Sequence, residues 1–183
     1  MADMTVHVAL LRAINVGGHT QAAMADLRKL LADLGFAGVR SLLNSGNLIF
    51  EDAGQTGAEL EQLLEVETAA RLGVRTEYFV RDAEDLSTVI AHNPFPEAAE
   101  RDPSHLVVMF LKEAPAATQV EALREASKGP EVIDAVGRHA YIVYPAGIGR
   151  SKLTNAVIEK RLGCPGTGRN WHTVLKLAEL SRT

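Results

Sequence analysis

The segment Val39–Phe50, with the sequence VRSLLNSGNLIF, decides the fold class of this chain. Val39–Leu43 and Asn47–Phe50 are short apolar runs that predict two strands, and Asn44–Ser45–Gly46 between them has the composition of a tight turn. Two strands joined by such a turn pair as antiparallel neighbours. The sheet to which they belong is therefore expected to be at least partly antiparallel.

The flanking residues complete a β-α-β-β-α-β order around that hairpin. Upstream, Val6–Leu11 predicts a strand, and leucines at helical spacing after it predict a helix. Downstream, Thr56 and Glu59 match the capping-box pattern at the start of a helix that ends at Gly73, and Thr76–Val80 predicts a further strand. This order is typical of the ferredoxin-like, split βαβ arrangement.

The second half of the chain repeats the order approximately. Leu106–Leu111 (LVVMFL) predicts a fully buried central strand. Glu131–Val136 and His139–Tyr144 predict a hairpin around Gly137–Arg138. Helices are expected on either side of this hairpin, and helical spacing over Arg169–Leu180 predicts a last helix, so this half reads β-α-β-β-α-α.

The expected architecture is thus an α+β fold with two ferredoxin-like halves, the second carrying an extra C-terminal helix. Residues 1–81 would form the N-terminal domain and residues 82–183 the C-terminal domain, a boundary that rests on topology because no low-complexity linker separates them. A chain of 183 residues is long enough to bury a core without covalent staples.

Composition excludes several classes of protein. The single cysteine, Cys164, excludes an internal disulfide and a multi-thiolate metal centre, and the six histidines lack metal-ligand spacing, so no metal site is predicted. No apolar run approaches the ~20 residues of a membrane helix. The N-terminal MADMTVHVALL lacks the basic segment of a signal peptide. We therefore expect a cytoplasmic protein with no membrane partner.

Charge is distributed unevenly. Residues 1–137 hold 11 Lys and Arg against 21 Asp and Glu, whereas residues 138–183 hold 8 against 2. A basic C-terminal quarter on a chain of net charge −4 indicates an anionic partner, or a surface that docks on the acidic remainder. A solvated helix face is the alternative interpretation.

The first candidate segment is Tyr144–Lys152, YPAGIGRSK, which follows a predicted strand and opens a predicted helix. Its glycines permit close backbone approach, and the helix N-terminus favours an anion. Arg150, Ser151 and Lys152 would hold a phosphate or carboxylate there. The alternative is a glycine-bearing turn in which Ser151 caps the helix and the two cations are solvated.

Two further segments carry candidate residues. One of them holds Arg169 and Asn170, which could bind an anion, and Trp171, which could stack on a ring. The alternative interpretation is a helix start in which Asn170 is the cap and Trp171 is a core anchor. A loop and a strand end in the first half supply the remaining candidates, whose alternative is an inter-domain contact without a ligand. These are Arg12, Asn15, Ser45 and Asn47.

The leading functional hypothesis is binding of a phosphate- or carboxylate-bearing small ligand, such as a nucleotide, in a cleft between the halves. One alternative is a nucleic-acid-binding module that uses the same basic surface, although the chain has only 5% aromatic residues for stacking. Another is an enzyme acting on a phosphorylated or carboxylate substrate, with His172 or Glu159 as acid or base. The sequence identifies no catalytic residue and no cofactor, and it leaves the oligomeric state open.

The same segments carry a family resemblance. The chain resembles the bacterial domain-of-unknown-function family numbered 1697, and one departure is Ala13 where the family usually has glycine. The resemblance implies an α+β fold with ferredoxin-like elements and implies no activity. The segments that carry it are Ala9–Gly18, Ser45–Asn47 with Phe50, His92–Phe95, Gly149–Leu153 and Thr167–Trp171.

Overall fold

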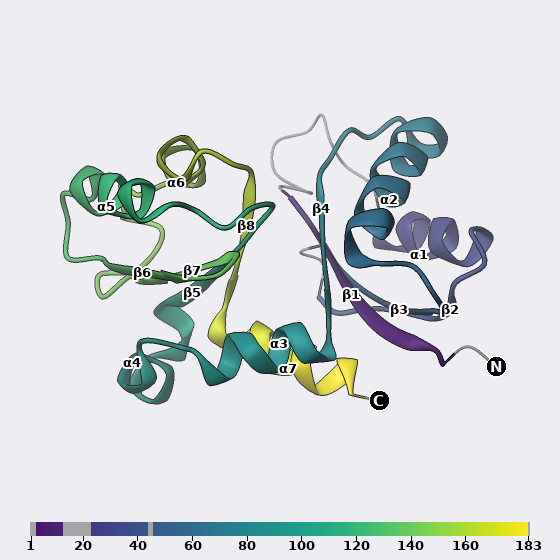
Figure 1. Cartoon of the computed structure of the whole chain (residues 1–183), viewed down its shortest axis with the longest axis horizontal. Coiled ribbons are helices and arrows are strands. Elements are labelled where there is room, and N and C mark those ends of the chain that lie inside the picture. Colours follow the sequence, from purple (N-terminus) through teal and green to yellow (C-terminus); the bar gives the residue numbers. More distant parts are fainter. Residues whose placement is uncertain (1–2, 13–22, 44–45, 183) are drawn as a thin grey trace. The chain divides into compact units, whose positions relative to one another are not determined.

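The computed structural model describes residues 3–12, 23–43 and 46–182 (Figure 1). It has an α+β fold with two four-stranded antiparallel sheets, each accompanied by helices. The chain divides into two compact units, Met1–Ser87 with Leu177–Thr183, and Thr88–Lys176. The domain limits 1–81 and 82–183 stay a prediction. Among the described residues, no helix is both long and apolar enough to cross a membrane.

The first sheet has the strand order β2-β3-β1-β4, so β1 is central and has an antiparallel partner on each edge. Helices α1 and α2 lie on one side of this sheet (Figure 1). Leu27 and Leu64 from the helices join Leu48 and Phe50 from β3 in a buried core on that side. The elements are β1 (Thr5–Leu11), α1 (Met24–Asp33), β2 (Ala37–Ser41), β3 (Asn47–Asp52), α2 (Gly57–Leu72) and β4 (Tyr78–Asp82).

The predicted capping box of α2 is confirmed. The backbone amide of Glu59 donates to Thr56 Oγ1 over 3.2 Å, and the amide of Thr56 donates to Glu59 Oε2 over 2.7 Å. Gly73 ends the helix in the left-handed conformation, at φ 67°. Local sequence signals of this kind fix where a helix begins and ends because they satisfy backbone groups that the helix itself leaves unpaired.

The second sheet has the order β6-β7-β5-β8, again with its most apolar strand in the centre. Helices α5 and α6 lie on one side of it (Figure 1). Their side chains Leu123 and Ile158 pack with Met109, Ile133 and Ile142 of the sheet. The remaining elements are α3 (Ala83–Ala91), α4 (Pro96–Arg101), the short helix η1 (Pro103–His105), β5 (Leu106–Leu111), α5 (Ala117–Ala126), β6 (Val132–Val136), β7 (His139–Val143), α6 (Asn155–Leu162), β8 (Gly166–Asn170) and α7 (Trp171–Ser181).

Strand β8 corrects the β-α-β-β-α-α order predicted for this half. The helix predicted over Arg169–Leu180 begins only at Trp171, and the five residues before it, GTGRN, pair with β5. These residues lack the apolar alternation of a typical strand, because two of them are glycines that pack against side chains of β5. A Cβ on Gly168 would lie 2.9 Å from Met109 Sδ and 3.0 Å from Val107 Cγ1.

We predict that Gly168→Ala destabilises the protein by roughly 1–3 kcal/mol, because the added methyl overpacks the interface between β8 and β5. Gly149→Ala is the matched control, since a Cβ there meets nothing within 4 Å. Urea denaturation of both variants measures the difference. Equal stability of Gly168→Ala and the wild type would show that Met109 and Val107 move aside without cost.

His7 on β1 is a buried polar residue in the first unit. It is 5% exposed, and among the described residues neither ring nitrogen has a hydrogen-bond partner. Its ring lies 5.6 Å from that of Phe50. Burial lowers the pKa of His7 below its ordinary value, although Asp52 and Asp82 favour the charged form. The imidazole is therefore neutral at pH 7, and burying it unpaired costs stability.

We predict that His7→Leu raises the free energy of unfolding by about 1 kcal/mol at pH 7.5, because it removes two unsatisfied ring nitrogens. As pH drops, His7 takes up a proton in the unfolded chain near its ordinary pKa of about 6.5, and in the folded chain only at lower pH. The free energy of unfolding of the wild type therefore falls as pH drops below that value. The variant lacks this contribution. Urea denaturation at pH 7.5 and pH 5 tests both effects, and an unchanged pH dependence in His7→Leu contradicts the assignment.

Candidate functional site

Two loops of the second unit enclose a hollow of about 240 Å³. One loop connects α5 to β6 and the other connects β7 to α6. We call this feature the basic hollow, because its lining combines three cationic side chains with prolines, alanines and one carboxylate. The lining residues are 126, 128–131, 144–147 and 150–153.

The loop between β7 and α6 is held at both ends by buried side chains. Tyr144 is 3% exposed and Leu153 is 4% exposed, and the Tyr144 hydroxyl donates to the Leu153 carbonyl oxygen over 3.2 Å. Gly147 has φ 90°, which favours glycine, and its amide donates to the carbonyl of Tyr144 over 2.9 Å. The anchored ends leave the middle of the loop, including Arg150, exposed to solvent.

A hydrogen bond joins the two loops across the basic hollow. The Ser151 hydroxyl donates to Glu131 Oε1 and accepts from the Leu153 amide over 3.0 Å. The Ser127 hydroxyl donates to the other oxygen of Glu131 over 3.4 Å. The hydrogen bond from Ser151 is the main cause that lowers the pKa of Glu131 below its ordinary value. Glu131 is therefore a carboxylate at neutral pH and ties the loops together.

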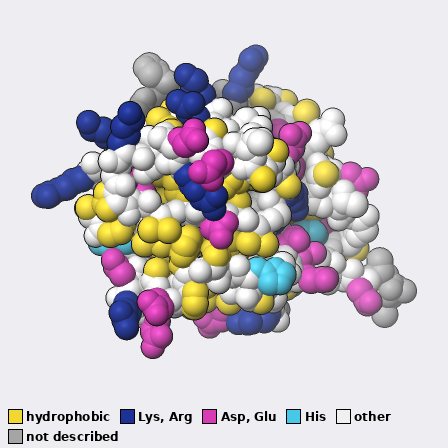
Figure 2. All heavy atoms as spheres, turned by 60° about the vertical axis from the view of Figure 1, so that its left-hand side comes forward, with side chains coloured by type: hydrophobic (Ala, Val, Ile, Leu, Met, Phe, Trp, Pro, Cys, Tyr) yellow, Lys and Arg dark blue, Asp and Glu magenta, His cyan; other side chains and the backbone are white. Residues whose placement is uncertain are grey.

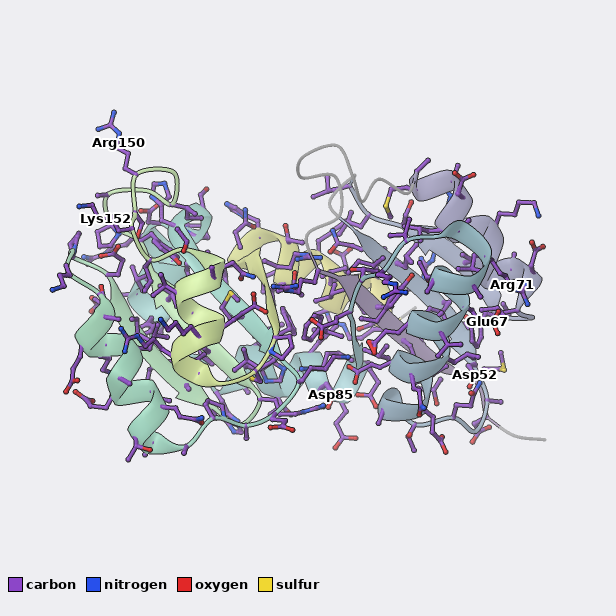
Figure 3. The ribbon with its side chains drawn as sticks, turned by 90° about the horizontal axis from the view of Figure 1, so that it is seen from above. Asp52, Glu67, Arg71, Asp85, Arg150 and Lys152 are labelled. Atoms are coloured by element: carbon purple, nitrogen blue, oxygen red, sulfur yellow. The ribbon has the colours of Figure 1, made fainter. Side chains whose placement is uncertain are left out.

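Three cations line the same hollow as this carboxylate without pairing with it. Lys128, Arg150 and Lys152 are exposed, and among the described residues none of them forms an ion pair. Arg150 and Lys152 project outward from their loop (Figure 3), and Figure 2 shows Lys and Arg side chains gathered along the upper part of one face. By contrast, Arg124 on α5 pairs with two carboxylates. Within the part of the chain that the structure describes, the three cations of the basic hollow thus have no carboxylate partner.

The structure brings together the three candidates of the first predicted segment, but it corrects their setting. Helix α6 begins at Asn155, and Thr154 is its cap, accepting from the Val157 amide over 3.4 Å. Ser151 therefore does not cap the helix, because its hydroxyl is engaged with Glu131 and Leu153. The lining residues of the basic hollow stop at Leu153, before the first turn of α6, and a contribution of the helix N-terminus to an anion cradle stays a prediction.

The candidates on β8 and α7 have structural roles. Arg169 is 8% exposed, its Nη1 donates to Thr167 Oγ1 and to the Gly168 carbonyl oxygen, and burial lowers its pKa to about 10. The Asn170 side chain accepts from the Thr173 amide over 3.0 Å and so caps α7. Trp171 is 5% exposed. None of the three candidates lines the basic hollow.

The candidates of the first half lie in the other unit or outside the described residues. Arg12, at the end of β1, has its Nε 3.9 Å from a carboxylate oxygen of Glu77. Asn47 is fully buried on β3 and donates to the Leu42 carbonyl oxygen over 2.9 Å. Asn15 and Ser45 lie outside the described residues. A cleft shared by the two halves stays a prediction.

Sequence reasoning did not select Lys128 or Glu131, and it included Tyr144 only as the first residue of a candidate segment. The signal was present in the predicted hairpin, since a two-residue turn at Gly137–Arg138 pairs Val132 with Val143 and sets Glu131 beside Tyr144. Extending the register one step beyond the last pair would have brought the loop after α5 next to the loop after β7. Among the described residues, no group of His, Cys, Asp and Glu could hold a metal ion.

We predict that Ser151→Ala raises the pKa of Glu131, because the main hydrogen bond to its charged form is lost. Since the Glu131 pKa is depressed in the folded protein, its stabilising contribution is present above the ordinary glutamate value and is lost as pH falls. NMR titration of the Glu131 side-chain carbon measures the shift. Ser127→Ala is the control, with a smaller effect, and an unchanged pKa in Ser151→Ala would contradict the assigned bond.

The fold and the basic hollow define an α+β protein of two sheet-and-helix units with a solvent-facing basic site in the second. The model of DUF1697, a protein family of unknown function, matches residues 4–141, and the chain belongs to this family. The matched range includes Lys128 and Glu131 and ends before the loop that carries Arg150.

One solved structure supports the same architecture along the whole chain. The chain is similar to the conserved bacterial protein SP0830 from Streptococcus pneumoniae, with 26% sequence identity and a TM-score of 0.76. The similarity covers 98% of this chain and 99% of the other. None of the curated proteins with which the chain was compared matches it.

Proposed function

We propose that this protein binds a small phosphate- or carboxylate-bearing ligand in the basic hollow. The observation that carries the proposal is the set of three cations, Lys128, Arg150 and Lys152, which line one concave site and have no ion-pair partner among residues 3–12, 23–43 and 46–182. Positive charges on one rim repel one another, so an anion bound between them gains attraction from all three. An oxyanion also accepts the hydrogen bonds that lysine and arginine donate.

The length of the loop that carries Arg150 supports the proposal. The corresponding connection in the first unit, between β3 and α2, has four residues, 53–56, whereas the connection between β7 and α6 has eleven, 144–154. Median connections in compact domains have about 4–6 residues, so the connection between β7 and α6 is about twice the usual length. The additional residues form one wall of the basic hollow and carry two of its cations.

The dimensions favour a small ligand. Pockets for drug-sized molecules have volumes of roughly 300–1,000 Å³, so a hollow of about 240 Å³ suits a smaller molecule. A nucleic-acid strand is less favoured, because Trp171 is buried and is not presented for base stacking. An enzymatic role through Glu159 is not favoured either, since its carboxylate accepts from the Gly166 amide over 3.1 Å and Asn155 Nδ2 over 2.9 Å.

We predict that methyl phosphate binds the wild type at low ionic strength. The triple variant Lys128→Ala, Arg150→Ala, Lys152→Ala should bind it at least about tenfold more weakly, because charge-assisted hydrogen bonds contribute most of the affinity. Isothermal titration calorimetry measures both dissociation constants. Added sodium chloride should weaken wild-type binding, since the cations are exposed.

The matched control is the double variant Lys160→Ala, Arg161→Ala, which removes two exposed cations of α6 that do not line the basic hollow. Its affinity for methyl phosphate should stay within about twofold of the wild type, because exposed charges outside the site contribute little. The proposal is overturned if the wild type fails to bind methyl phosphate, or if the triple variant binds it as tightly as the wild type does. Binding of single-stranded RNA alone would favour the nucleic-acid hypothesis instead.

We also propose that each half has the ferredoxin-like arrangement. The strand orders β2-β3-β1-β4 and β6-β7-β5-β8 support this, since both place the first strand of the half between the third and the fourth, with the second strand at an edge. Each half also follows a β-α-β-β-α-β sequence of elements. A cytoplasmic location remains a prediction.

A further inference from the structure

The carboxylate inside the basic hollow is the feature that a simple anion site does not explain. Glu131 lines the hollow together with three cations, yet it pairs with none of them and is held by Ser151 and Ser127. A carboxylate has about four lone-pair sites for hydrogen bonds. Ser151, Ser127 and the backbone amide of Glu131 itself occupy part of this capacity, and the remainder can accept from a bound molecule.

We infer that Glu131 is a specificity-determining residue, and that the ligand is a phosphate monoester of a hydroxyl-bearing sugar, as in a sugar phosphate or the ribose phosphate of a nucleotide. This inference rests on the proposed function, because it places the phosphate group among Lys128, Arg150 and Lys152. A sugar hydroxyl would then donate to Glu131. The alanine and proline side chains of the lining would contact the carbon skeleton.

The opposite charges of Glu131 and the three cations determine which ligand is preferred. A fully ionised phosphate monoester without hydroxyl groups gains attraction from the three cations but is repelled by Glu131, and it offers that carboxylate no donor. A ligand that carries hydroxyl groups beside its phosphate satisfies both kinds of group, since hydrogen bonds to charged partners are the stronger ones. The hydrogen bond from Ser151 keeps the carboxylate in place, so the acceptor is positioned before the ligand arrives.

The test compares two ligands with the same anionic group. Ribose 5-phosphate and methyl phosphate are both phosphate monoesters, but only the first has free hydroxyl groups. We expect the wild type to bind ribose 5-phosphate about tenfold more tightly, the difference that one hydrogen bond to a charged acceptor supplies. Calorimetry at fixed pH and salt measures both dissociation constants.

Glu131→Gln removes the charge and retains a carbonyl oxygen that accepts from Ser151. In this variant the preference for ribose 5-phosphate should fall below about threefold, while binding of methyl phosphate is unchanged or tighter because a repelling charge is gone. A purely structural role of Glu131 would instead weaken both ligands together. Thermal unfolding of Glu131→Gln accompanies the titrations to establish that the variant is folded.

The outcomes separate the two proposals. If the wild type binds both ligands with the same affinity, or if Glu131→Gln keeps the full preference, the inference about Glu131 is overturned and the proposed anion site stands. If the wild type binds neither ligand, the proposed function itself fails. The wild-type comparison alone decides the inference when Glu131→Gln does not fold.

Discussion

The register of the hairpin between β6 and β7 is the constraint on which the basic hollow depends. A two-residue turn at Gly137–Arg138 joins these strands, and the pairing runs without interruption to Val132 and Val143. A slip of one residue would turn Ile133 from the core to solvent, so burial fixes the register. The same register sets Glu131 beside Tyr144 and thereby brings together the two loops that enclose the hollow.

The two halves show how one architecture can carry different surface loops in its two units. Both sheets have a buried central strand and two helices on one side, and these features account for the core of each unit. The connection that follows the hairpin is not constrained by the core, because it runs over the surface between a strand end and a helix start. Residues can be added there with little effect on packing, and in the second unit they supply Arg150 and Lys152.

The sequence predicted most elements because their signals are local. Helix boundaries at Thr56 and Gly73 depend on caps, and the central strand Leu106–Leu111 is apolar throughout. Strand β8 could not be predicted in this way, since the requirement for Gly166 and Gly168 comes from side chains of β5 that are more than fifty positions away in the chain. Non-local packing of this kind leaves no periodic pattern in the strand itself.

The candidate site was predictable in part for a related reason. A basic, glycine-bearing segment suggested Arg150, Ser151 and Lys152, and all three line the hollow. Arg169 belonged to an equally basic segment, yet it lies on a strand whose own Thr167 and Gly168 accept its hydrogen bonds. Residue type alone does not distinguish an arginine that faces solvent from one that is buried and satisfied.

The charge balance of the hollow has an energetic consequence for the free protein. Three cations on one rim repel one another, and ion pairs with Glu131 would relieve part of that repulsion. The structure instead gives Glu131 hydrogen bonds from two serines, which are short, neutral side chains. Exposed ion pairs contribute only about 0–1 kcal/mol, so forgoing them costs the fold little. The cations and Glu131 are consequently not paired with one another, as the proposed selection of both groups of one ligand requires.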